Sequence, residues 1–241
     1  LGIATPQLAA LPYIMGPDGK KKLSKRDGAN DVLDYLRDGY LPEALLNFLA
    51  TLGWNDGTEQ EVFTVRELIT KFSLERVQRS GAKFEEQRLQ WLNGAHIRRL
   101  TLDDLSDRVE SFWPASAAPA SDDYKKAVLG LVQERLKFFS ELPGLTSFFF
   151  EEPQPDLSLI DTHKKLATLS RDEQRTLLQT ARQALAESDF SVSDLQARLN
   201  GLLETTGQKP AIIFSLIRIA TTWAAASPGL AESLSVLGKD T

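Results

Sequence analysis

The sequence predicts a mostly α-helical protein, and three observations support this prediction. Apolar residues recur at spacings of three and four along most of the 241 residues, which is the period of an amphipathic helix. Two capping-box patterns, Thr64-x-x-Glu67 and Ser170-x-x-Glu173, mark helix starts. No convincing strand pattern follows Met15. With 42% hydrophobic residues over this length, we expect two helical units, each with its own core.

The chain begins with a short strand-like segment and then turns helical. The apolar run Leu11–Met15 precedes a Gly-Pro-Asp-Gly turn, which predicts the last strand of a sheet whose other strands lie upstream. A helical pattern starts at Val32. The next helix is expected to open at Pro42, a favourable first-turn residue, and to stop at Gly53. Its buried face is expected to comprise Leu41, Leu45, Phe48, Leu49 and Leu52.

Three further helices and a break are expected between Thr64 and Ser121. The first opens at the Thr64 capping box, and the second ends at Asn93-Gly94. The third opens at Thr101. The stretch Pro114–Ser121 is rich in proline, alanine and serine and is typical of a linker, so we place a domain boundary between about Leu100 and Ser121.

Beyond this break the sequence predicts four helices. One carries an apolar stripe from Val128 to Phe139. The second opens at the Ser170 capping box, and the third is expected to be capped by Ser193-x-x-Gln196 and to end at Gly207. The last opens at Pro210 and has almost no polar face, so it should be buried.

Composition excludes several functional classes. The sequence has no cysteine, and its two histidines, His96 and His163, are far apart, so neither a disulfide framework nor a metal site is expected. The longest apolar run, Ala211–Ala220, contains Arg218 and is too short for a membrane span. The first ten residues lack the features of a signal peptide, and the chain starts without methionine, so we expect a fragment. The net charge of −5 argues weakly against nucleic acid, although basic residues cluster locally.

Three motifs together resemble bacterial glutamyl-tRNA synthetase, a class I aminoacyl-tRNA synthetase. The sequence Lys22-Leu23-Ser24-Lys25-Arg26 is similar to the mobile Lys-Met-Ser-Lys-Ser loop in the form that the glutamate enzymes commonly carry. The helix pattern Gly39–Trp54 follows at the family's spacing. The segment Arg88–Gly94 resembles the family's Lys-Leu-x-Trp-Leu-Asn-Gly sequence, with Glu85 and Arg88 as conservative departures.

This resemblance implies a three-part organisation. Residues 1–31 would be the end of the nucleotide-binding α/β domain, residues 32–100 a helical stem-contact domain, and residues 101–241 a helical anticodon-binding cage, with a possible subdivision near 155–170. In the complete enzyme, glutamate would be activated with ATP and Mg²⁺ and transferred to tRNA(Glu). The fragment would be inactive alone and would supply tRNA recognition. A monomer in the cytoplasm is expected.

The resemblance also implies roles for the basic loop. Lys25 would be the main catalytic lysine, assisted by Lys22, and the ATP contacts would come from Lys22, Leu23, Ser24, Lys25 and Arg26. Amino-acid activation builds negative charge on the α-phosphate and the departing pyrophosphate, and ammonium groups held there stabilise the transition state. The alternative is that this basic run is only a solvated surface.

Candidate RNA contacts are Arg98, Arg99, Lys164, Lys165 and Arg218. The arginines have structural alternatives. An arginine pair at a helix end is commonly a solvated cap that interacts with the helix dipole, and a guanidinium within an apolar helix must reach a carboxylate, the surface or RNA. Aromatic residues that could stack on unpaired bases are Trp113, Trp223 and Phe148–Phe150, although such aromatics are more often core.

Two alternatives to a tRNA(Glu)-specific fragment remain open. A non-discriminating enzyme would also charge tRNA(Gln), and the sequence gives no anticodon-reading residues that decide this. A helical protein-interaction module without RNA binding is favoured by the acidic net charge and by the generic second half. A steep salt dependence of RNA affinity would separate the two classes.

Overall fold

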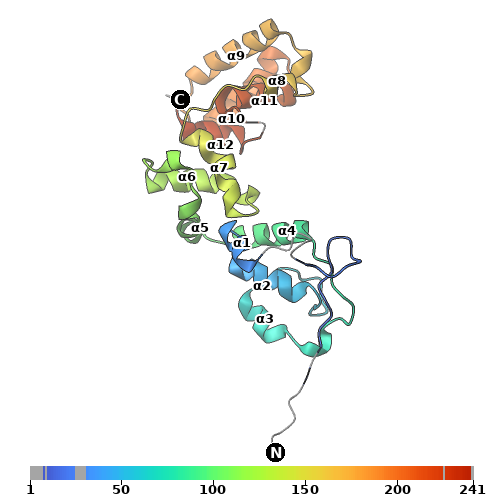
Figure 1. Ribbon diagram of the computed structural model, residues 1–241. Helices are drawn as coiled ribbons and strands as arrows, with labels where there is room; N and C mark the ends of the chain where they lie inside the picture. The colour runs from blue at the N-terminus through green and yellow to red at the C-terminus, as the bar shows by residue number, and fades with distance from the viewer. Residues whose placement is uncertain (1–7, 9, 25–30, 225, 240–241) are drawn as a thin grey trace, which may run out of the picture. The chain divides into compact units, whose positions relative to one another are not determined.

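The computed structural model describes residues 8, 10–24, 31–224 and 226–239. Its named elements are helices, which confirms the mostly α fold (Figure 1). No strand forms over the described residues of the N-terminal segment, so the prediction of a strand at Leu11–Met15 is wrong. Met15 makes only isolated bridges with Lys22 and Lys83, because the segment pairs with a turn and a loop and not with a sheet. None of the helices in these residues is long and apolar enough to cross a membrane.

The structure divides into two compact units. Unit 1 comprises residues 1–101 and 134–141, and unit 2 comprises residues 102–133 and 142–241. The change from one unit to the other therefore falls between Thr101 and Leu102. The sequence did not predict that the chain returns to unit 1 at residues 134–141.

The returning segment docks against Gly39. The backbone amide of Phe139 donates to the carbonyl oxygen of Gly39 at 3.2 Å, and that of Ser140 donates to Asp38 at 3.1 Å. Gly39 has φ 83°, in the left-handed region, and a Cβ placed there would lie 2.4 Å from the Cβ of Phe139. Both the backbone conformation and the close approach therefore require glycine at this position.

Unit 1 is built on the packing of α2 against α3 and α4. Its helices are α1 (Val32–Arg37), α2 (Pro42–Thr51), α3 (Val65–Lys71) and α4 (Glu86–Ile97). Pro42 occupies the first turn of α2, and the Thr64 capping box opens α3, both as the sequence predicts. One core cluster of this unit comprises Tyr35, Tyr40, Leu45, Phe48, Leu52, Leu89 and Leu92.

The stop expected at Asn93-Gly94 is wrong, because α4 continues to Ile97. Asn93 is fully buried, and its side chain bonds to distant segments and does not compete with the helix backbone. Its Oδ1 accepts the backbone N–H of Leu41 at 2.8 Å, and its Nδ2 donates to the carbonyl oxygen of Lys137. A residue that usually ends helices is here the polar link that holds three segments together.

Unit 2 contains the remaining helices, and α9, α10 and α11 pack on one another within it (Figure 1). The helices are α5 (Leu102–Val109), α6 (Asp122–Val132), α7 (Leu142–Thr146), α8 (Ser158–Asp161), α9 (Arg171–Ala186), α10 (Val192–Thr206), α11 (Pro210–Thr222) and α12 (Leu230–Leu237). The largest core cluster gathers side chains of α8 to α12. Pro210 opens α11, and the Ser170 capping box opens α9, as predicted.

Three local predictions beyond residue 102 are wrong. The helix expected to carry the apolar stripe from Val128 to Phe139 ends at Val132, and separate 3₁₀ turns follow at Gln133–Arg135 and Phe139–Glu141. Ser191, not Ser193, caps α10, because the Ser191 side chain accepts the backbone N–H of Asp194. The segment Pro114–Ser121 is not a linker. It contains a 3₁₀ turn at Ala115–Ala117, and Ala117 is fully buried, so the small residues that suggested flexibility allow close packing.

Candidate nucleic-acid interface

The basic loop near the N-terminus rests on a tight turn. The amide of Gly16 donates to the carbonyl oxygen of Lys21 at 2.8 Å, which closes the turn. Asp18 Oδ1 accepts the amides of Lys20 and Lys21 at 2.9 and 3.3 Å. These backbone hydrogen bonds hold the pKa of the Asp18 carboxyl below its usual range. The carboxylate thus fixes the backbone from which three consecutive lysines project.

This turn is anchored to the segment before α4. The amide of Met15 donates to Ala82 at 2.8 Å, and the amide of Phe84 donates to the carbonyl oxygen of Met15 at 2.9 Å. A Cβ at Gly81 would lie 2.7 Å from the carbonyl oxygen of Tyr13, so only glycine lets these two segments of the chain approach this closely. The basic loop is therefore positioned by the segment of unit 1 that precedes α4.

The described residues place part of the predicted ATP-contacting set. Lys22 is exposed, and its Nζ lies 4.3 Å from the centre of the Tyr13 ring, a cation–π contact that orients the ammonium group. The backbone amide of Leu23 donates a hydrogen bond to the carbonyl oxygen of Ile14 at 2.8 Å, and Ser24 is exposed on the surface. Lys25 and Arg26 lie outside the described residues.

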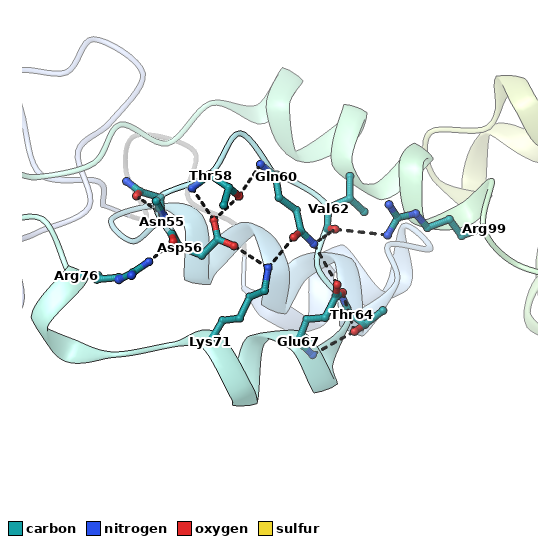
Figure 2. Close-up of polar contacts among 11 residues, drawn as sticks. Asn55, Asp56, Thr58, Gln60, Val62, Thr64, Glu67, Lys71, Arg76 and Arg99 are labelled. Atoms are coloured by element: carbon teal, nitrogen blue, oxygen red, sulfur yellow. Dashed lines mark hydrogen bonds and ion pairs between the residues drawn. The ribbon is translucent and has the colours of Figure 1, made fainter.

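A second polar region of unit 1 surrounds the loop between α2 and α3 (Figure 2). Asp56 accepts from Lys71 Nζ at 2.7 Å and from the Thr58 hydroxyl at 2.6 Å, and these hydrogen bonds lower the pKa of the Asp56 carboxyl to about 2. Lys71 also donates to Gln60 Oε1 at 2.8 Å. The loop is thereby tied to the end of α3 by charge-assisted hydrogen bonds.

The predicted pair Arg98 and Arg99 lies at the end of α4 in unit 1. Arg98 is partly buried, and its Nε lies 4.0 Å from Glu134 Oε2. Arg99 is exposed, and its Nη1 donates a long hydrogen bond of 3.5 Å to the carbonyl oxygen of Val62 (Figure 2). Most donors of the Arg99 guanidinium are thus available to a phosphate, whereas Arg98 has a carboxylate neighbour.

Lys164 and Lys165 lie in unit 2 and are exposed. No ion pair to either lysine occurs in the described part of the chain. The neighbouring His163 has a structural role, because its Nδ1 accepts the amides of Lys165 and Leu166 at 3.3 Å each. The imidazole therefore shapes the turn that presents the two lysines.

Arg218 lies on α11, also in unit 2. It is partly buried, and its Nε donates to the Ser227 hydroxyl at 2.8 Å. Ser227 is buried, with 3% of its surface exposed, and its hydroxyl donates to the carbonyl oxygen of Pro228 at 3.2 Å. The guanidinium is thus oriented by a buried hydroxyl in the segment that precedes α12 (Leu230–Leu237). The five predicted RNA contacts therefore divide between the two units, Arg98 and Arg99 in the first and the other three in the second.

The aromatic candidates have different surroundings. Phe148 and Phe149 are buried in the core that contains Val128, as the core interpretation predicts. Trp113 packs edge-on against Phe150, with ring centres 5.4 Å apart. Trp223 remains partly exposed at the end of α11. Part of the Trp223 side chain packs against the core of unit 2, so only its exposed part is available for stacking on a base.

Comparison with known proteins identifies both parts of the chain. The family model described as "Anticodon binding domain" matches residues 102–241, and "tRNA synthetases class I (E and Q), catalytic domain" matches residues 1–91. The glutamate–tRNA ligase of Chlorobaculum parvum is 36% identical over 255 residues, with 100% of this chain and 49% of that protein covered. The glutamate–tRNA ligase of Dehalococcoides mccartyi is 37% identical over 248 residues, with 100% and 50% covered.

Solved structures agree with the fold. A glutamate tRNA ligase from Elizabethkingia meningosepticum, crystallised with its amino acid, matches 99% of this chain and 50% of its own, with a TM-score of 0.80 and 24% identity. This chain spans about half the length of the curated relatives that it matches. The chain therefore belongs to the glutamyl-tRNA synthetase family of class I aminoacyl-tRNA synthetases, and its two family matches fit a C-terminal portion of such an enzyme.

Proposed function

We propose that this chain is the tRNA-recognising portion of a glutamate–tRNA ligase. The observation that carries the proposal is the anticodon-binding family match over residues 102–241, which coincides with the start of unit 2 at Leu102. The resemblance over residues 1–91 adds the end of the catalytic domain. A cytoplasmic location and a monomeric state stay predictions.

In the complete enzyme, the basic loop would act on ATP. ATP with Mg²⁺ would supply the α-phosphate that the glutamate carboxylate would attack, with pyrophosphate as the leaving group. The donor set fits this role: Lys22 is exposed, and in the described residues no carboxylate lies within ion-pair distance of it. We propose that Lys22, Leu23 and Ser24 help to hold the triphosphate. Lys25 and Arg26 complete the proposed set, with Lys25 as the principal catalytic lysine.

The tRNA contacts would come from both units. We propose that Arg99, with most of its donors available, and Arg98 contact phosphates of the tRNA stem. In unit 2, Lys164 and Lys165 would contact phosphates, and Arg218 would meet the anticodon. The hydrogen bond from Arg218 to Ser227 supports this last role, because an oriented guanidinium reads a base edge better than a free one.

Binding of the chain to tRNA(Glu) transcript across a salt series tests the proposal. We expect binding that falls steeply with salt and weakens when the anticodon is altered. Anticodon-mutated tRNA(Glu) and tRNA(Gln) are the controls. Equal affinity for tRNA(Gln) would indicate a non-discriminating enzyme. An absence of binding at low salt would contradict the proposal and favour a helical protein-interaction module.

A further inference from the structure

A groove on unit 2 combines a basic rim with an apolar floor. Arg171, Arg175, Leu178 and Arg182 lie on one stripe of α9, at spacings of four, three and four residues. This stripe lines a cavity of about 440 Å³ together with Leu157, Ile160, Gln174, Gln179, Ala220 and Trp223. The volume lies within the range of pockets that hold small organic groups.

The charges on the rim favour an anionic occupant. Arg171 pairs with Asp161 at 2.6 Å, and Arg175 lies 3.5 Å from Asp172, whose side chain is 93% exposed. Arg182 is exposed and has no ion pair in the part of the chain that the structure describes. The rim thus carries three guanidinium groups and only two carboxylates, so positive charge is in excess. Guanidinium groups bind phosphate through paired hydrogen bonds.

Trp223 has an unusual backbone conformation. It ends α11 with φ 44° and ψ 38°, the left-handed region that usually requires glycine, and its amide donates to Ile219 at 2.8 Å. A bulky side chain in this conformation is strained, and such outliers point to a functional constraint on the side chain. No hydrogen bond to the indole N–H occurs among the described residues. The side chain both packs on the core of unit 2 and lines the groove, and the strained backbone holds it in this position.

A second cavity beside Trp223 has the opposite charge. Its volume is about 590 Å³, and Glu151 and Glu152 line it together with Phe148, Phe149 and Phe150. Trp223 and Ala220 line both cavities. A phosphate would be repelled by the two carboxylates on one side of Trp223 and attracted by the arginines on the other. The α9 side is thus the one that suits a nucleotide.

We propose that the α9 groove binds an unpaired nucleotide of RNA, with the base on Trp223 and Leu178 and the phosphate on Arg182 and Arg175. This inference rests on the proposed tRNA-binding function and adds a subsite that is distinct in its residues from Arg218. Aromatic stacking accepts any base, so the subsite contributes affinity without reading sequence. Contacts between arginines and RNA phosphates are also independent of the base sequence.

The first test is the affinity of Trp223→Gly for tRNA(Glu), measured with the whole chain. We expect binding to weaken by about 5- to 150-fold, which is the effect of losing one stacked base. Glycine relieves the left-handed strain and so offsets part of the lost packing, and circular dichroism verifies that the variant is folded. Trp223→Phe keeps a stacking ring and is expected to retain most of the affinity.

The second test separates the groove from a general charge effect. Arg182→Ala should weaken binding and reduce the slope of log affinity against log salt by about 0.7, the contribution of one single-strand phosphate contact. Lys209→Ala is the matched control, because Lys209 is exposed in the same unit, carries the same charge and lies outside the groove. It should leave the slope unchanged.

The outcomes distinguish this inference from the proposed function. If the wild-type chain binds tRNA(Glu) and both Trp223→Gly and Arg182→Ala bind it with unchanged affinity, the proposed nucleotide subsite is wrong and the tRNA-binding function stands. An equal loss in Arg182→Ala and Lys209→Ala would also overturn it. If the wild-type chain bound no tRNA at all, the proposed function would fall, and the groove with it.

Discussion

Asn47 is the residue at which three segments of unit 1 meet. It is fully buried on α2, and its Oδ1 accepts the amide of Phe63 at 2.8 Å. Its Nδ2 donates to the carbonyl oxygen of Glu61 at 3.1 Å. His96 Nε2 lies 3.0 Å from the same Oδ1. Since an amide oxygen only accepts, Nε2 must carry the proton, which fixes the histidine tautomer.

Replacement of Asn47 by alanine is expected to destabilise unit 1. The change leaves the buried Phe63 amide and the buried His96 Nε2–H without an acceptor. Two such groups reduce the free energy of unfolding by about 2–6 kcal/mol. Urea unfolding measures this loss, and the exposed Asn55→Ala is the control, expected to change stability little. Similar losses in the two variants would contradict the role assigned to Asn47.

The buried His96 predicts a pH dependence of stability. Burial lowers the pKa of His96, with opposite contributions from Glu43, which raises it, and Arg99, which lowers it. Between the two pKa values the imidazole of His96 is protonated in the unfolded chain and neutral in the folded chain. The contribution of His96 to the free energy of unfolding is therefore fully present above about pH 6.5 and is lost as the pH falls through the folded pKa. Comparison of denaturation curves for the wild type and His96→Gln from pH 8 to pH 5 checks this. The wild type should lose more stability than the variant, and parallel curves would contradict the prediction.

At the scale of elements, local signals in the sequence predict helix starts well and tertiary contacts poorly. The capping boxes at Thr64 and Ser170 act within four residues, so the sequence contains all of their partners. The continuation of α4 through Asn93 depends on Leu41, which lies 52 residues away, and no local pattern contains that contact. The α9 groove was missed for the same reason, because it requires three helices. Its one local signal was the spacing of Arg171, Arg175, Leu178 and Arg182.

Two glycine substitutions on different elements are expected to have opposite effects. Gly39→Ala combines an unfavourable left-handed backbone with a contact of 2.4 Å to the Phe139 Cβ, so it should lower the free energy of unfolding by at least about 2 kcal/mol. Gly201→Ala lies within α10, where a Cβ meets nothing within 4 Å, and should raise it by about 0.5–1 kcal/mol. Thermal and urea unfolding measure both changes. A destabilised Gly201→Ala would contradict the assignment of this site as an open helix position.

At the scale of the whole molecule, the two units have separate cores and the chain passes between them at three points. The core that contains Phe48 belongs to unit 1, and the core that contains Leu199 belongs to unit 2. The sequence predicted two units, but it did not predict that residues 134–141 would leave the second and pack on Gly39. Backbone contacts between segments that are 100 residues apart leave no local pattern, so the spacing of apolar residues does not reveal them.

Separate cores predict that a change in one unit alters local stability in that unit first. Hydrogen exchange followed by mass spectrometry resolves this, because amides in each unit open with their own free energy. Gly39→Ala should speed exchange in peptides from α2 and α4 and leave those from α9 to α11 near wild type. Gly201→Ala should slow exchange in α10 and its neighbours alone. If either substitution shifted exchange equally in both units, the protein would unfold as one cooperative body, and recognition by the anticodon-binding unit would then depend on the stability of the first.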